Sequence, residues 1–153
     1  MIERSVVHGT FTIERVYDAT PARVFRAWAD PDAKARWFVG PAGWQLLERA
    51  IDFRVGGKEH VSGRMASGTV STFDSYYHDI VPDQRIIYSY HMHLDHTRKI
   101  SVSLATVELK PEGRATRLVF TEQGAFLDGY DDAGSREHGT GFLLNQLGAE
   151  LQR

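Results

Sequence analysis

The stretch DATPARVFRAWADPDAKARWF, residues 18–38, decides how the chain begins to fold. It holds two prolines, and each follows a residue that can cap a helix: Thr20 precedes Pro21, and Asp30 precedes Pro31. Threonine and aspartate side chains accept hydrogen bonds from the free N–H groups of a first helical turn, and proline has the φ that this turn needs. The stretch therefore predicts two short helices, beginning near residues 21 and 31.

Apolar and basic residues divide the surfaces of these two predicted helices. Val24, Phe25 and Trp28 form one apolar stripe on the first helix, which predicts a buried face. We interpret the basic residues of both helices as solvated; they are Arg23, Arg26, Lys34 and Arg36. A nucleic-acid groove would need a larger positive excess than a chain of formal net charge −2 offers, so we expect no nucleic-acid partner.

The sequence on both sides of this stretch alternates as β-strands do. Residues 9–17 place Phe11, Ile13 and Tyr17 on one face of a strand. After the helices, turn signals separate six further β-rich segments, at residues 44–55, 58–65, 69–81, 85–94, 99–110 and 116–123. Because short turns join antiparallel neighbours, these segments predict a meander of six strands.

The C-terminal part indicates a loop followed by one helix. Residues 124–135, GAFLDGYDDAGS, predict a loop by their Gly, Asp and Ser content. Ser135 is then expected to cap a helix of roughly 17 residues. Its buried side is expected to carry Phe142, Leu143, Leu147 and Leu151. Gly139 and Gly141 inside this helix suggest close approach to another backbone or a bend, or else a tolerated weakness.

Together these elements predict an α+β fold: a seven-stranded curved antiparallel sheet, two short helices after its first strand, and a long C-terminal helix across it. The length of 153 residues favours a single domain, residues 1–153. The absence of cysteine excludes disulfides and thiolate chemistry. Without a signal-peptide core or a long apolar run, we expect a cytoplasmic protein with no membrane span, either a monomer or a homodimer.

Five segments fall in the order seen in the SRPBCC (START/Bet v-like, helix-grip) superfamily: ATPARVFRAWADPDAKARWF, FRVGG, HDIVPDQRIIYSY, ELKPEGRATRLVFTEQ and SREHGTGFLLNQLGAEL. Within it, the chain resembles the branch named after the heat-shock-protein-90 ATPase activator homologue, from about Phe11 to Leu151. The resemblance implies a sheet that grips the last helix, with a cavity between them for a hydrophobic or amphipathic small molecule. It also implies that the Pro21 helix and residues 124–135 are placed like gates to this cavity.

Strand alternation, taken with this resemblance, selects candidate ligand-binding residues. One face of a strand carries Tyr88, Tyr90 and Met92, and one face of the last strand carries Phe120 and Glu122. The full set is Tyr77, Tyr88, Tyr90, Met92, Phe120, Glu122, Phe142, His60 and Arg64. The alternative is that these residues fill a solid core, with the tyrosine hydroxyls at its rim.

Two carboxylates are candidates for acid–base chemistry if the protein is an enzyme of the cyclase, dehydratase or hydrolase kind. They are Glu122 and Asp79, and burial among aromatic residues would favour their neutral forms unless an arginine such as Arg64 paired with them. No nucleophile triad, phosphate-binding loop or metalloprotease motif accompanies them. We therefore expect binding rather than turnover, without a cofactor. A third possibility is a module that regulates a chaperone ATPase.

The segment HMHLDH raises the question of a metal site. His91 and His93 share one face of a strand, and such a pair binds zinc or copper when a third ligand is present. Because Met92 marks the opposite face as the apolar one, we expect both histidines to point to solvent. The sequence therefore predicts no metal site.

Overall fold

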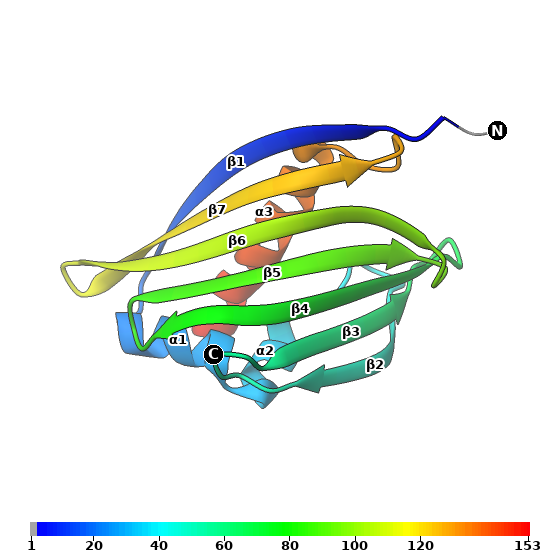
Figure 1. Ribbon diagram of the computed structural model, residues 1–153. Coiled ribbons are helices and arrows are strands. Elements are labelled where there is room, and N and C mark those ends of the chain that lie inside the picture. The colour runs from blue at the N-terminus through cyan, green and yellow to red at the C-terminus, as the bar shows by residue number, and fades with distance from the viewer. Residues whose placement is uncertain (1–2) are drawn as a thin grey trace.

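The computed structural model, which describes residues 3–153, has the predicted α+β helix-grip architecture. One seven-stranded antiparallel sheet, in the order β1-β7-β6-β5-β4-β3-β2, curves round the C-terminal helix (Figure 1). The strands are β1 (Val6–Tyr17), β2 (Gln45–Ile51), β3 (Lys58–Arg64), β4 (Val70–Val81), β5 (Arg85–Leu94), β6 (Arg98–Glu112) and β7 (Ala115–Leu127). The helices are α1 (Pro21–Ala29), α2 (Pro31–Trp37) and α3 (Ala133–Leu151). Residues 1 and 2 of the expected domain lie outside the described residues.

Both short helices begin where the capping residues predict. The Thr20 hydroxyl accepts from the backbone N–H of Arg23 at 3.3 Å, and the Asp30 carboxylate accepts from that of Ala33 at 3.1 Å. Their two tryptophans, Trp28 and Trp37, are buried and meet edge to face, with ring centroids 4.8 Å apart. The helices therefore pack against each other and close one end of the sheet.

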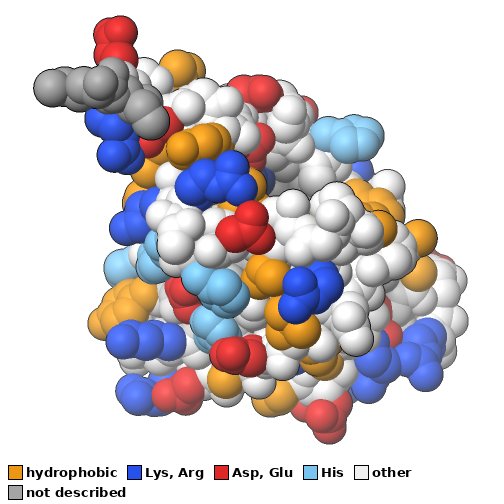
Figure 2. Space-filling view, turned by 90° about the vertical axis from the view of Figure 1, so that its right-hand side faces the viewer, with side chains coloured by type: hydrophobic (Ala, Val, Ile, Leu, Met, Phe, Trp, Pro, Cys, Tyr) orange, Lys and Arg blue, Asp and Glu red, His pale blue; other side chains and the backbone are white. Residues whose placement is uncertain are grey.

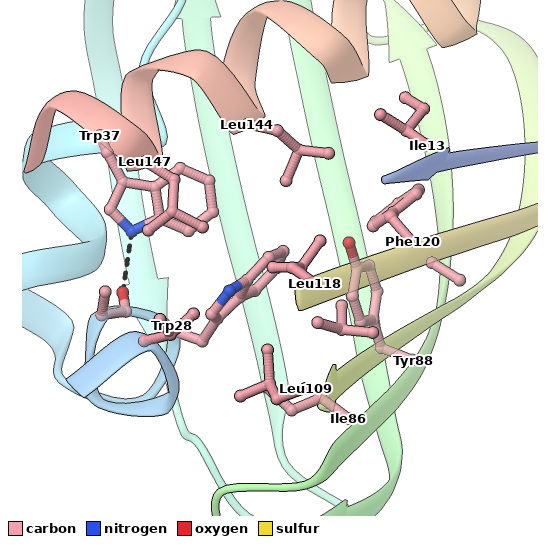
Figure 3. Close-up of a cluster of buried hydrophobic side chains, with 14 of the residues drawn as sticks. Ile13, Trp28, Trp37, Ile86, Tyr88, Leu109, Leu118, Phe120, Leu144 and Leu147 are labelled. Carbon is pink, nitrogen blue, oxygen red and sulfur yellow. Dashed lines mark hydrogen bonds between the residues drawn. The ribbon is translucent and has the colours of Figure 1, made fainter. Parts of the chain in front are cut away.

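The core lies between the concave face of the sheet and α3. Leu144 and Leu147 of α3 belong to one buried cluster with Leu118 and Phe120 of β7 and with the two tryptophans (Figure 3). The Tyr17 hydroxyl donates to the backbone oxygen of Leu144 at 2.7 Å, which fastens the edge strand β1 to the helix. None of the helices between residues 3 and 153 is long and apolar enough to cross a membrane.

The predicted loop at residues 124–135 is wrong for its first part. Strand β7 continues to Leu127 and pairs there with Val6 at the start of β1. The cap is Asp132, whose side chain accepts from the backbone N–H of Ser135 at 2.8 Å, so α3 begins at Ala133 instead of after Ser135. The aspartate-rich part of the segment forms the turn, whereas the apolar GAF part joins the ladder.

The buried face of α3 also differs from the expectation: Leu143 is only half-buried, and Phe142 is exposed. Phe142 is 41% exposed, because it lies about 200° round the helix from the fully buried Leu144. The buried stripe consists of Arg136, Thr140, Leu144, Leu147 and Leu151. Neither helix glycine named above approaches another backbone: a Cβ at Gly139 would meet no atom within 4 Å, and one at Gly141 would meet only an arginine nitrogen, at 3.3 Å.

Lys34 is not the solvated residue that its sequence position suggests. Its side chain is only 3% exposed, and its ammonium group contacts a carboxylate oxygen of Glu59 on β3 at 2.8 Å. The same oxygen accepts from the hydroxyl of Tyr77 at 2.9 Å, and the ammonium lies 4.5 Å from the ring centroid of Phe38. A buried ion pair therefore joins α2 to the sheet.

We expect Lys34→Met to lower the free energy of unfolding by about 3–5 kcal/mol, because it leaves the buried Glu59 carboxylate without its cationic partner. Lys34→Met combined with Glu59→Gln should recover more than half of that loss, since glutamine is neutral and still accepts from Tyr77. Urea denaturation measures both. Arg54→Ala removes an exposed ion pair and serves as control. A double variant no more stable than Lys34→Met would contradict this account.

Candidate functional site

A cavity of about 550 Å³ lies between α3 and the concave face of the sheet. Its walls are mainly aromatic and aliphatic. The apolar lining consists of Trp28, Trp37, Phe38, Val39, Pro41, Trp44, Val61, Met65, Phe73, Tyr88, Tyr90, Met92, Phe120, Phe142, Leu143 and Leu144. These side chains come from all three helices, from β3, β4, β5 and β7, from the segment after α2, and from the turn after β3, so elements from most of the chain form the cavity together.

Trp44 forms part of the wall because two glycines make room for it. A Cβ on Gly63 of β3 would lie 2.0 Å from the indole nitrogen of Trp44, and one on Gly40 would lie 2.3 Å from its ring. Such distances are far below van der Waals contact, so any larger residue at either position would displace the indole. The glycines thus fix a large apolar side chain across β3, beside the cavity.

The polar part of the lining gathers at one end. It comes from the turn before α3 and from the first turns of that helix: Asp131, Ser135, Arg136, His138 and Thr140. Ser71 of β4 also lines the cavity. A molecule in the cavity would therefore meet apolar walls along most of its length and polar groups at the N-terminal end of α3, an arrangement typical of small-molecule sites.

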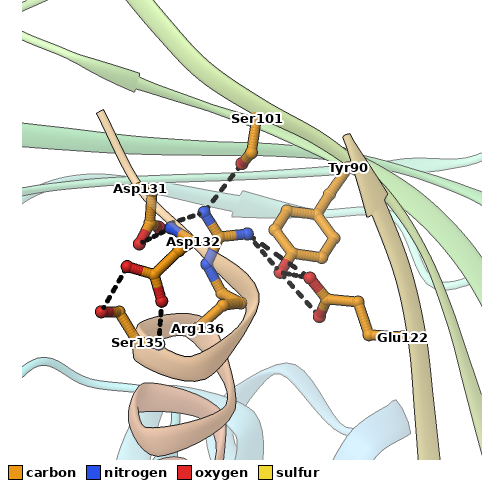
Figure 4. Close-up of polar contacts among 7 residues, drawn as sticks. All are labelled: Tyr90, Ser101, Glu122, Asp131, Asp132, Ser135 and Arg136. Atoms are coloured by element: carbon orange, nitrogen blue, oxygen red, sulfur yellow. Dashed lines mark hydrogen bonds and ion pairs between the residues drawn. The ribbon is translucent and has the colours of Figure 1, made fainter. Parts of the chain in front are cut away.

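A hydrogen-bonded network of Tyr90, Glu122 and Arg136 holds this polar end (Figure 4). The Tyr90 hydroxyl donates to the Glu122 carboxylate at 2.8 Å and accepts from Nη1 of Arg136 at 2.8 Å. Nη1 of Arg136 also lies 3.5 Å from Oε2 of Glu122. Nη2 donates to Ser101 and to Asp131, each at 2.8 Å. Both terminal nitrogens of the guanidinium thus already donate hydrogen bonds to other groups of the protein.

Burial sets the ionisation of these groups. Burial raises the pKa of Glu122, and the Arg136 charge and the Tyr90 hydrogen bond only partly oppose that effect. Burial also raises the pKa of Tyr90 well above its usual range, so the phenol stays neutral and acts as a donor. For Arg136, burial acts to lower the pKa, but nearby Tyr90 and Glu122 raise it, so the guanidinium remains charged.

The structure brings five of the candidate binding residues together at the cavity: Tyr88, Tyr90, Met92, Phe120 and Phe142. Phe142 is both exposed and part of the lining, so it lies at the mouth. Glu122 does not line the cavity. It has no exposed surface and lies behind Tyr90, because it shares the concave face with Phe120 but sits one step further along β7.

Three other candidates lie outside the cavity. Tyr77 is buried beside Glu59, in the ion-pair region described above. His60 faces the convex side of the sheet, and Arg64, at the end of β3, donates to the backbone oxygen of Gly68. Strand alternation predicts on which face of the sheet each residue lies, but it does not predict which part of that face the helices cover.

Asp79 lies on the convex side, away from the cavity. A register shift between Tyr77 and Asp79 in the pairing of β4 with β5 interrupts the alternation, so the two residues do not share a face. Asp79 instead accepts from the guanidinium of Arg85 at 2.6 Å, on the surface. The partner of the buried carboxylate Glu122 is Arg136, not Arg64.

The convex face carries its own polar row. In the side view of Figure 2, several histidine side chains lie near one another, with acidic and basic side chains beside them. Nδ1 of His60 lies 2.6 Å from Oδ1 of Asp74, and Nε2 lies 3.1 Å from Oε2 of Glu48. The hydrogen bond to Asp74 raises the pKa of His60, whereas burial lowers that of His91.

Sequence reasoning missed Arg136 and the three tryptophans of the wall. Arg136 stands four residues before Thr140 and eight before Leu144, so it begins the buried stripe of α3. That spacing is the signal that could have found it: a charged residue on the apolar face of a helix needs a buried partner. The position of Trp44 depends on Gly40 and Gly63, which only the folded chain brings to it.

The raised pKa of Glu122 predicts a specific pH dependence. The folded protein holds this proton to a higher pH than the unfolded chain does, where the usual value is 4.5. The contribution of Glu122 to stability is thus complete below that value and is lost as pH rises through the folded pKa. The unfolding free energy of the wild type, minus that of Glu122→Gln, should therefore fall as pH rises above 4.5.

Chemical denaturation of both proteins at a series of pH values measures this difference. The carboxyl groups of Asp95, Asp128 and Glu150 have lowered pKa values and act in the opposite direction, but they are common to both proteins and cancel. Glu137→Gln, on the exposed side of α3, controls for the loss of one carboxylate. A difference that stays constant or rises with pH would show that folding does not raise the pKa of Glu122.

Comparison with known proteins places the chain among structures of the same fold. An uncharacterized protein from Rhizobium leguminosarum shares 46% identity over 99% of both chains, with a TM-score of 0.93. The protein Mll3558 from Rhizobium loti shares 50% identity over 95% of this chain and 99% of its own, with a TM-score of 0.87. CV1439 from Chromobacterium violaceum shares 28% identity over 94% and 97%, with a TM-score of 0.77.

The comparison with curated proteins gave no match. Residues 18–152 match the family described as Activator of Hsp90 ATPase homolog 1-like protein. This match includes both short helices, all strands but β1, and the whole of α3. The chain therefore belongs to the Activator of Hsp90 ATPase homolog 1-like family, within the SRPBCC superfamily.

Proposed function

We propose that the protein binds a hydrophobic or amphipathic small molecule in the cavity between α3 and the sheet. The observation that carries this proposal is the cavity itself, about 550 Å³ in volume and walled mainly by aromatic and aliphatic side chains. Small-molecule sites have volumes of about 300–1,000 Å³ with such walls and a few polar groups. Burial of apolar ligand surface, at about 25 cal/mol per Å², supplies most of the affinity.

The charges at the polar end favour a neutral ligand. Arg136 is the permanently charged basic group there, and its terminal nitrogens already contact Tyr90, Ser101 and Asp131. An anionic ligand would have to compete with those contacts and would also meet the Asp131 carboxylate. Hydroxyl or carbonyl groups on the ligand suit this end better, because Ser135 and Thr140 can exchange neutral hydrogen bonds with them.

The positions of the two candidate acid–base residues do not favour catalysis. A general acid or base must come within hydrogen-bond reach of the proton that it transfers. Glu122 is covered by Tyr90 and Arg136, and Asp79 is on the far side of the sheet. The buried carboxylate is better explained as the anchor of the network that shapes the cavity.

Gly139 offers a direct test, because it lines the cavity and a Cβ there would enter open space. Gly139→Leu should keep the fold, since leucine is the better helix former by about 0.8 kcal/mol. It should weaken binding of the neutral probe N-phenyl-1-naphthylamine by about tenfold, because overfilling an apolar site costs about 1–3 kcal/mol. Fluorescence titration measures the affinity.

The matched control is Glu137→Leu, which adds the same side chain to an exposed position of α3 outside the cavity lining. It should bind the probe as the wild type does. Thermal unfolding should show that both variants are folded. The proposal that the cavity binds a small molecule would be contradicted if the wild type showed no saturable binding. Equal affinity in the wild type and Gly139→Leu would contradict it as well.

A further inference from the structure

Three potential metal ligands meet on the convex face of the sheet. Asp74 of β4 stands directly opposite His91 of β5, and His93 follows two residues later on the same side. One ligand atom from each of the three lies within 4.8 Å of the others. The sequence showed the histidine pair, but the carboxylate comes from the neighbouring strand, seventeen positions earlier than His91.

The distances between these ligand atoms are somewhat longer than those around a bound ion. Zinc bonds of about 2.0–2.1 Å in a tetrahedral arrangement place ligand atoms about 3.4 Å apart. Small side-chain rotations would close the remaining gap, and the rings of His91 and His93 are already 5.0 Å apart between centroids. Nδ1 of His91 is buried and has no hydrogen-bond partner within residues 3–153, so that nitrogen gives up no protein contact when the ring turns.

A second set of contacts orients the carboxylate. His60 stands directly opposite Asp74 on β3 and contacts its Oδ1 at 2.6 Å, while Glu48 contacts the other ring nitrogen of His60 at 3.1 Å. Oδ1 of Asp74 therefore contacts His60, whereas Oδ2 takes no part in this contact. Metal-ligating carboxylates are commonly held in this way, and such outer contacts affect affinity about 10–100-fold.

We propose that Asp74, His91 and His93 form a binding site for a divalent transition-metal ion, such as Zn²⁺, Co²⁺, Ni²⁺ or Cu²⁺. Two imidazoles and one carboxylate suit these ions better than Ca²⁺ or Mg²⁺, which prefer oxygen ligands alone. Three protein ligands leave a further coordination position for water. The site lies on the opposite face of the sheet from the cavity, so it is independent of the proposed ligand binding.

The test is a titration of purified protein, without a polyhistidine tag, with Zn²⁺ by calorimetry and with Co²⁺ by visible absorption. The wild type should bind one equivalent of Zn²⁺, and Co²⁺ should give the d–d bands of a low-coordinate site. His91→Gln, His93→Gln and Asp74→Asn should each weaken Zn²⁺ binding by about tenfold or more. Zn²⁺ should also raise the thermal midpoint of the wild type, because it binds the folded state.

The control variant is His78→Gln. His78 is an exposed histidine of β4 that contacts Ser89 at 2.7 Å and lies outside the three-ligand group. It should bind Zn²⁺ as the wild type does, and circular dichroism without metal should show all variants folded. Failure to bind one equivalent, or a loss in His78→Gln as large as that in His91→Gln, would overturn the proposed site.

Discussion

The carboxylate of Glu122 has no contact with solvent, and the arrangement of the cavity follows from how the protein accommodates it. A buried carboxylate is costly unless it is neutral or surrounded by donors. Tyr90 and Arg136 supply the donors, from β5 and from the fourth residue of α3. The network therefore ties two strands to the start of the helix, and it can form only when α3 lies at one distance from the sheet.

A second buried charge fixes the other side of the cavity. Lys34 and Glu59 join α2 to β3, so the tryptophans of α1 and α2 cannot move toward the sheet independently. An apolar helix over an apolar face would gain by closing the gap, because empty space forfeits dispersion contacts. Two polar anchors with fixed lengths, one at each side, resist that collapse. The cavity of about 550 Å³ lies between surfaces that are otherwise hydrophobic.

The order of the elements could be predicted from the sequence because each signal is local. Thr20 and Asp30 cap the helices that follow them, and alternation places Tyr88, Tyr90 and Met92 on one face. The predictions that were wrong concern residues whose positions depend on contacts between distant segments. Lys34 looks like a surface lysine until Glu59, twenty-five positions later, lies beside it. Likewise, nothing near residue 79 announces the register shift that turns Asp79 to the convex side.

The same register also separates the two proposed sites. Along β5, Tyr88, Tyr90 and Met92 face the cavity, while His91 and His93 face away, so alternate residues of one strand belong to different environments. A strand places successive side chains on opposite faces, and a one-residue slip would exchange them all. Such a slip would put the imidazoles in the aromatic core and the tyrosines in water. The buried hydrogen bonds of Tyr90 thus fix the position of the histidines on the other face.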